Sequence, residues 1–123
     1  MQWPPQYLDN YRPEPDQEYW SPELETMPPA DRDRHILAKL QEQVRYAYQN
    51  SWFYQEFYKD LPVDPANLQS LEEFAQLPIL TKEDIRREQE QHPPYGRFLC
   101  VPTEEIFRIH GTSGTTGRPT VFG

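Results

Sequence analysis

The chain carries little positive charge. Its 12 lysines and arginines stand against 20 aspartates and glutamates, which gives a formal net charge of -8. A protein that neutralises nucleic-acid phosphates or anionic lipid headgroups needs an excess of basic side chains on the binding surface. We therefore expect neither a nucleic-acid partner nor a membrane-surface partner.

Cysteine, histidine clusters and long apolar runs are also scarce. Cys100 is the single cysteine, so no internal disulfide can form, and the three histidines are too far apart in sequence for a ligand-spaced metal site. No apolar run approaches the roughly 20 residues of a membrane-spanning helix, and the opening residues 1–5 (MQWPP) lack the features of a secretion signal. These absences predict a cytoplasmic protein that holds no metal of its own.

Glycine is rare, and it is concentrated near one end. Of the five glycines, Gly111, Gly114 and Gly117 lie within residues 111–120 (GTSGTTGRPT), together with five hydroxyl side chains. A flexible backbone with free N–H groups and extra hydroxyl donors is typical of a loop that wraps phosphate oxygens. Neither common fingerprint fits, because a Walker A loop requires Gly-Lys-Ser/Thr and the Rossmann pattern requires a glycine at the position of Ser113.

A different phosphate loop fits this segment. Residues 112–119 (TSGTTGRP) resemble the loop of the adenylate-forming enzymes, and Thr120-Val121 after the proline resembles the phenylacetate-CoA ligase branch, since many other members have Lys-Gly there. Two further stretches, 19–27 (YWSPELETM) and 77–84 (LPILTKED), and the pair Ile109-His110 fit the same branch. The chain is thus similar to the phenylacetate-CoA ligase family from about Tyr19 to its last residue.

The resemblance implies an AMP-forming ligase. Such an enzyme activates an aryl carboxylic acid with ATP, which brings Mg²⁺, and transfers the acyl group to coenzyme A. The loop would hold the β and γ phosphates, with glycines that allow close approach and hydroxyls that donate hydrogen bonds. The binding residues it implies are Thr112, Ser113, Gly114, Thr115, Thr116 and Gly117. The family's acid pocket and catalytic residues lie beyond Gly123, so the catalytic residues stay unknown.

Three side chains near the loop have more than one interpretation. Arg118 is either a solvated arginine or a partner for phosphate charge, and His110 is either a structural histidine or a neighbour of the nucleotide. Cys100 is typical of a small core residue, because no basic cluster lies beside it in sequence.

The resemblance also bears on length, since adenylate-forming enzymes are several times longer than 123 residues. We therefore expect the N-terminal part of such a ligase, inactive when isolated. The chain stops just after the expected start of a strand at Thr120, which fits this expectation. Two alternatives stay open: a related adenylating enzyme with another acyl acceptor, and a truncated, non-catalytic product. The oligomeric state is also open, with a homodimer among the options.

The expected fold is mixed α/β. Residues 1–18 form an extended, proline-rich acidic tail, residues 19–97 a mostly helical segment, and residues 98–123 the start of an α/β ATP-binding domain. A strand over residues 106–110, the glycine-rich turn and a second strand from Thr120 would make a hairpin that carries the phosphate loop at its tip.

The helices are predicted from spacing and from caps. Apolar residues recur at helical spacing over residues 31–50, Ser51 caps a second helix that extends to Tyr58, and Ser70 and Thr81 begin two capping boxes. The second helix carries a dense aromatic patch. Core packing or a subunit interface is the more typical use of such a patch, and a wall for an aromatic acid substrate is the alternative. Its members are Trp52, Phe53, Tyr54, Phe57 and Tyr58.

Overall fold

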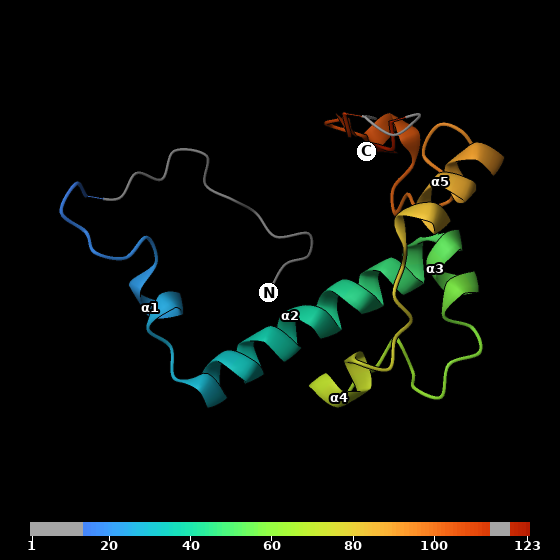
Figure 1. The fold of residues 1–123 in the computed structure, drawn as a ribbon. Coiled ribbons are helices and arrows are strands. Elements are labelled where there is room, and N and C mark those ends of the chain that lie inside the picture. Colours follow the sequence, from blue (N-terminus) through green and yellow to red (C-terminus); the bar gives the residue numbers. More distant parts are fainter. Residues whose placement is uncertain (1–13, 114–118) are drawn as a thin grey trace.

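The computed structural model describes residues 14–113 and 119–123, and this part of the chain is mostly helical with one small sheet (Figure 1). The mixed α/β prediction therefore holds only as helices with a single strand pair. The helices are α1 (Pro22–Glu25), α2 (Pro29–Asn50), α3 (Trp52–Phe57), α4 (Leu71–Phe74), α5 (Lys82–Gln91) and a 3₁₀ turn, η1 (Thr103–Glu105); the strands are β1 (His110–Gly111) and β2 (Val121–Phe122).

Helix α2 is the long axis of the molecule, with α3 beside its C-terminal end (Figure 1). The prediction of a helix over residues 31–50 is confirmed, and the helix begins two residues earlier, at Pro29. Proline suits the first helical turn because its φ is already helical and its missing N–H has no partner there. Val44 on α2 is buried, and the Gln41 side chain donates to the carbonyl of Leu68, which is 1% exposed.

Helix α3 carries the aromatic core. Ser51 caps it as predicted, with its hydroxyl accepting from the Tyr54 N–H, and the Phe53 ring is 8% exposed. The centroid of that ring lies 4.2 Å from the centroid of Phe98 and 5.2 Å from that of Phe57. Core packing is therefore confirmed for Phe53. Core packing is wrong for Trp52, which is 75% exposed and makes none of the ring contacts of Phe53.

The two predicted capping boxes differ in the structure. At α5 the box is complete, because the Asp84 N–H donates to the Thr81 hydroxyl and the Thr81 N–H donates to the Asp84 carboxylate. At α4 the Glu73 N–H donates to the Ser70 hydroxyl, but the Glu73 carboxylate accepts from the N–H of Gln69, one residue before the cap. Both helices begin where the sequence predicts, and only the reciprocal bond at α4 is displaced.

The predicted strand over residues 106–110 is wrong for all but its last residue. Pairing is limited to His110 with Phe122 and Gly111 with Val121, in antiparallel register. Residues 106–109 have no regular structure, and Phe107 is 93% exposed. An alternating pattern predicts a strand only where a second strand is available to pair, and within the described residues the partner is two residues long. The hairpin is present, but shorter than expected.

The aromatic core gives a first test of the packing. Replacing Phe53 with alanine removes the ring between Phe57 and Phe98, so we expect the free energy of unfolding to fall by roughly 3–5 kcal/mol. Urea unfolding followed by far-UV circular dichroism measures the change. Trp52→Ala on the same helix is the matched control and is expected to cost no more than about 0.5 kcal/mol. Equal losses in the two variants would contradict the central position of Phe53.

Candidate functional site

The hairpin β1–β2 brings together the described ends of the glycine-rich segment. Thr112 and Ser113 follow β1 directly, and Thr120 precedes β2. Both Thr112 and Ser113 are exposed. Of the other predicted binding residues, Gly114, Thr115, Thr116 and Gly117 lie outside the described residues, as does Arg118.

Two threonines close the base of the hairpin. The Thr112 N–H donates to the Thr120 carbonyl at 3.0 Å, and the Thr120 N–H donates to the Thr112 hydroxyl at 3.0 Å. The two hydroxyl oxygens lie 3.2 Å apart, within hydrogen-bond distance. Thr120 is 3% exposed, so these bonds are shielded from water on its side. We call this set of contacts the threonine clamp. It fixes the separation of the two chain ends between which the predicted phosphate loop extends.

Helix α5 holds the outer edge of β2 through a side-chain amide. Gln89 Nε2 donates to the carbonyl of Val121 at 2.5 Å, and the Val121 N–H donates to Gln89 Oε1 at 3.1 Å. Gln89 is 9% exposed. Sequence reasoning missed this residue, because a glutamine in a strongly polar helix resembles a solvated one. Its one signal is the spacing from Ile85, four positions earlier, which places both side chains on the same helix face.

The residue before Gln89, Glu88, makes a second buried polar contact on α5. The Glu88 carboxylate accepts from the backbone N–H of Arg97 at 3.0 Å and from its guanidinium Nε at 2.7 Å and Nη2 at 3.0 Å. Hydrogen bonds from Arg97 lower the pKa of Glu88 below its ordinary value, although burial acts in the opposite direction. Gly96 has a φ of 68°, and a Cβ there would lie 2.9 Å from Glu88 Cγ. Glycine is therefore required at this turn.

Arg97 also connects α5 to the aromatic core. Its carbonyl accepts from the Ser51 hydroxyl at 2.9 Å and from the Phe53 N–H at 3.1 Å, at the N-terminus of α3. A single residue thus pairs with Glu88 through its N–H groups and caps α3 through its carbonyl. The cap at Ser51 was predictable, but the contribution of Arg97 from 46 positions away was not.

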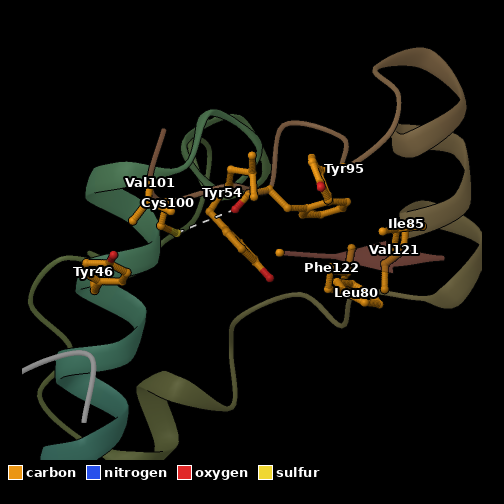
Figure 2. A pocket seen from close by; sticks show the side chains of 12 residues that line it. Tyr46, Tyr54, Leu80, Ile85, Tyr95, Cys100, Val101, Val121 and Phe122 are labelled. Atoms are coloured by element: carbon orange, nitrogen blue, oxygen red, sulfur yellow. Dashed lines mark hydrogen bonds between the residues drawn. The ribbon is translucent and has the colours of Figure 1, made fainter. Parts of the chain in front are cut away.

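A mostly apolar cavity of about 410 Å³ lies beside β2 (Figure 2). Its lining comes from α2, α3, α5, the segments around residues 80 and 95–101, and β2 itself. The residues are Tyr46, Tyr54, Leu80, Ile85, Tyr95, Phe98, Leu99, Cys100, Val101, Val121, Phe122 and Gly123. Burial raises the pKa of the Cys100 thiol and also raises the pKa of the Tyr54 hydroxyl. Cys100 is half-buried on the wall of this cavity, so its predicted core position is met only in part.

Neither a metal cluster nor a membrane span occurs in the part of the chain that the structure describes. No three histidine, cysteine, aspartate or glutamate side chains gather there in a way that could hold a metal ion. Within the same residues no helix combines the length and the apolar character that crossing a bilayer requires.

The Glu88–Arg97 contact predicts a pH dependence of stability. Because the folded pKa of Glu88 is lowered, its contribution is fully present above its ordinary pKa of about 4.5 and is lost as the pH falls through the folded value. We expect Glu88→Gln to be less stable than the wild type at pH 7, with a difference that narrows below about pH 4.5. Thermal unfolding across pH 3–7 measures it.

The control for that series is Glu90→Gln, which changes an exposed carboxylate two positions further along α5. Its effect on stability is expected to be small, since exposed charges contribute little. A difference between wild type and Glu88→Gln that stays constant, or widens, as the pH is lowered would contradict the assigned contact.

Comparisons with known proteins place the chain in a family. No protein-family model matches it. The phenylacetate-coenzyme A ligase of Thermus thermophilus is 40% identical to it over 109 residues, which cover 85% of this chain and 22% of that enzyme. The enzyme of the same name from Pseudomonas putida is 39% identical over 90 residues, covering 73% of this chain and 19% of that enzyme. The chain spans about a fifth of the length of these curated relatives.

A solved structure agrees with the sequence relatives. A 2-hydroxyisobutyryl-CoA ligase in complex with 2-HIB-AMP and CoA matches all of this chain and 26% of its own, with a TM-score of 0.85 and 48% identity. Sequence and structure therefore point the same way as the motifs in residues 111–120. Over the stretch that aligns, the chain belongs to the phenylacetate-CoA ligase family of adenylate-forming enzymes.

Proposed function

We propose that this chain is the N-terminal part of an AMP-forming acid-CoA ligase. In the first half-reaction a carboxylate oxygen attacks the α phosphorus of ATP, an acyl adenylate forms and pyrophosphate leaves. In the second, the thiol of coenzyme A attacks the acyl carbon and AMP leaves. The observation that carries the proposal is the 48% identity to a CoA ligase over the whole chain, glycine-rich segment included.

Within that reaction we assign the chain to phosphate binding. Residues Thr112, Ser113, Gly114, Thr115, Thr116 and Gly117 would hold the β and γ phosphates, which stabilises the departing pyrophosphate and aligns the α phosphorus. The threonine clamp supports this assignment, because it already fixes the two ends of the segment, so less conformational entropy is lost when phosphate binds. Ser113 follows the clamp directly and is exposed.

The remaining parts of the site would come from elsewhere in the ligase. Mg²⁺ would arrive with ATP, and its charge would offset that of the phosphates. The chain supplies no nucleophile in this scheme. The proposal also divides the chain into an extended tail (1–18), a helical segment (19–97) and the start of the ATP-binding domain (98–123). A cytoplasmic location is part of the same proposal.

The acid is proposed at the level of class. The relatives named phenylacetate-coenzyme A ligase favour an aryl acid, whereas the solved structure at 48% identity is of a 2-hydroxyisobutyryl-CoA ligase and favours a small 2-hydroxy acid. Phenylacetate and 2-hydroxyisobutyrate are therefore the two test acids. An arylacetate would gain most from an apolar pocket, and a hydroxy acid from a hydrogen-bond partner for its hydroxyl.

A fusion enzyme tests the proposal. Joining this chain at Gly123 to the part of the 2-hydroxyisobutyryl-CoA ligase that follows its aligned segment restores a full-length ligase. We expect acid-dependent exchange of labelled pyrophosphate into ATP, because the chain would supply the missing phosphate loop. The isolated chain is expected to give none. A folded fusion without exchange, with either acid, would contradict the function, and exchange by the isolated chain would contradict the assignment of a partial site.

A single substitution tests the phosphate loop within that fusion. Gly114→Val places a branched side chain where the backbone must approach phosphate, so we expect exchange to fall on the order of 100-fold while thermal stability is kept. Gly111→Ala is the control, because a Cβ there would have its nearest neighbour, the Thr120 carbonyl oxygen, at 4.0 Å. Unchanged exchange in Gly114→Val would remove the loop from the mechanism.

A further inference from the structure

We propose that Gln89 is a positioning residue for nucleotide binding: it holds strand β2, and through β2 the threonine clamp, in the register that the nucleotide phosphates require. This inference rests on the proposed ligase function. Gln89 lies on α5, outside the glycine-rich segment, and neither the motif nor the family resemblance assigns it a role. Its side-chain amide forms hydrogen bonds with both the carbonyl and the N–H of Val121 in the hairpin.

The direction of the hydrogen bonds shows which edge of β2 Gln89 occupies. In an antiparallel pair, the N–H and C=O of one residue point together toward the partner strand or together away from it, and this alternates along the strand. The Thr120 carbonyl accepts from Thr112, so Thr120 faces β1 and Val121 faces away from it. The Gln89 amide fills that outer edge with one donor and one acceptor, as a neighbouring strand would. It thus replaces a third strand at a single residue.

Burial makes this contact selective for one register. Gln89 is 9% exposed, so a shift of β2 by one residue would leave the amide facing a residue whose backbone groups point the other way. An unpaired donor and acceptor at such a site lose their hydrogen bonds to water without replacement. The neighbouring side chains Ile85 and Val121 line the same cavity and lie close together (Figure 2), which limits where β2 can move.

Helix α5 is a fixed support for this contact. Its N-terminus is closed by the Thr81–Asp84 capping box, and its last turn is held by Glu88 on Arg97. Val121, which Gln89 binds, is joined by one peptide bond to Thr120 of the threonine clamp. A binding segment is positioned well when its supporting residues are themselves held by packing and hydrogen bonds. Gln89 meets that condition.

A positioning residue and a merely structural residue can be told apart by which kinetic constants change when the residue is substituted. Loss of a structural contact lowers stability and lowers the amount of active enzyme, with no selective effect on one substrate. Loss of a positioning contact raises the KM for ATP and for pyrophosphate, while the KM for the acid stays the same. Measurement of all three constants separates the two roles.

The test uses the fusion ligase with two substitutions at Gln89. Gln89→Met keeps the length and removes both hydrogen bonds; Gln89→Glu keeps the shape and loses the N–H donor to Val121. We expect the KM for ATP to rise about tenfold in Gln89→Glu, which loses one hydrogen bond, and by more than that in Gln89→Met, which loses both, with the KM for the acid unchanged in each. Gln91→Met and Gln91→Glu are the matched controls, because Gln91 is exposed two positions along the same helix. They are expected to behave as the wild type.

A second measurement on the 123-residue chain keeps the proposal testable without catalysis. Amide hydrogen exchange at Val121 and Thr112, followed by NMR, is expected to accelerate at least about tenfold in Gln89→Met and to stay unchanged in Gln91→Met. Unchanged protection in Gln89→Met would overturn the contact itself.

The outcomes of the fusion experiment separate the two proposals. Wild-type fusion without pyrophosphate exchange would overturn the ligase function, and the role of Gln89 with it. Wild-type fusion that is active, with Gln89 variants whose KM for ATP is unchanged, would overturn the role of Gln89 alone. Variants that lose stability and kcat without a change in the KM for ATP would also overturn it, because that result describes a structural residue.

Discussion

The arrangement of the hairpin and the aromatic core depends on the pairing of Glu88 with Arg97. Glu88 is 5% exposed, and a carboxylate in such a place is stable only when its oxygens are fully hydrogen-bonded. Arg97 satisfies both oxygens with its guanidinium and its backbone N–H, and its carbonyl then caps α3 beside Phe53. The aromatic core, the turn at Gly96 and the last part of α5 are thereby held in one connected unit.

Helix α5 connects this unit to the hairpin, because Gln89, the residue after Glu88, binds Val121. Glu88 faces the turn and the aromatic core, while Gln89 faces Val121 at the outer edge of β2. The two side chains use adjacent positions of one helix for two different partners, which lie far apart in the chain. A two-residue strand pair would be marginal by itself. Support from α5 and closure by the threonine clamp explain how so short a hairpin keeps a defined register.

Local signals were enough to predict helices α2 to α5, but not the single turns α1 and η1. The spacing of apolar residues placed α2, and short-range capping chemistry placed the starts of α3, α4 and α5, since these features depend on residues three or four positions apart. The strand predicted over residues 106–110 was wrong because strands need a partner, and the partner, Val121–Phe122, pairs over two residues. Local pattern carries no information about that length.

In the candidate site, too, one part was predictable from local sequence and another part was not. The glycine-rich segment was recognisable from its composition, and the family it indicated is confirmed by relatives at 40% identity. The contacts that hold the segment's ends were not predictable, because Gln89 and Glu88 are polar residues in a polar helix. The one local signal, the spacing of Gln89 from Ile85, indicates a shared helix face but does not identify Val121 as the partner. Thr112 was expected to donate to phosphate, and in this structure its hydroxyl contacts Thr120; its contact with phosphate stays a prediction.

The central claim is that a hairpin already held by α5 and by the threonine clamp receives the nucleotide phosphates. The most direct measurement is a crystal structure of the fusion ligase with a non-hydrolysable ATP analogue and Mg²⁺. We expect the β and γ phosphate oxygens within hydrogen-bond distance of residues 112–117, with the Thr112–Thr120 and Gln89–Val121 bonds unchanged. Phosphates bound away from the hairpin, or a nucleotide complex in which both sets of bonds are broken, would contradict the account.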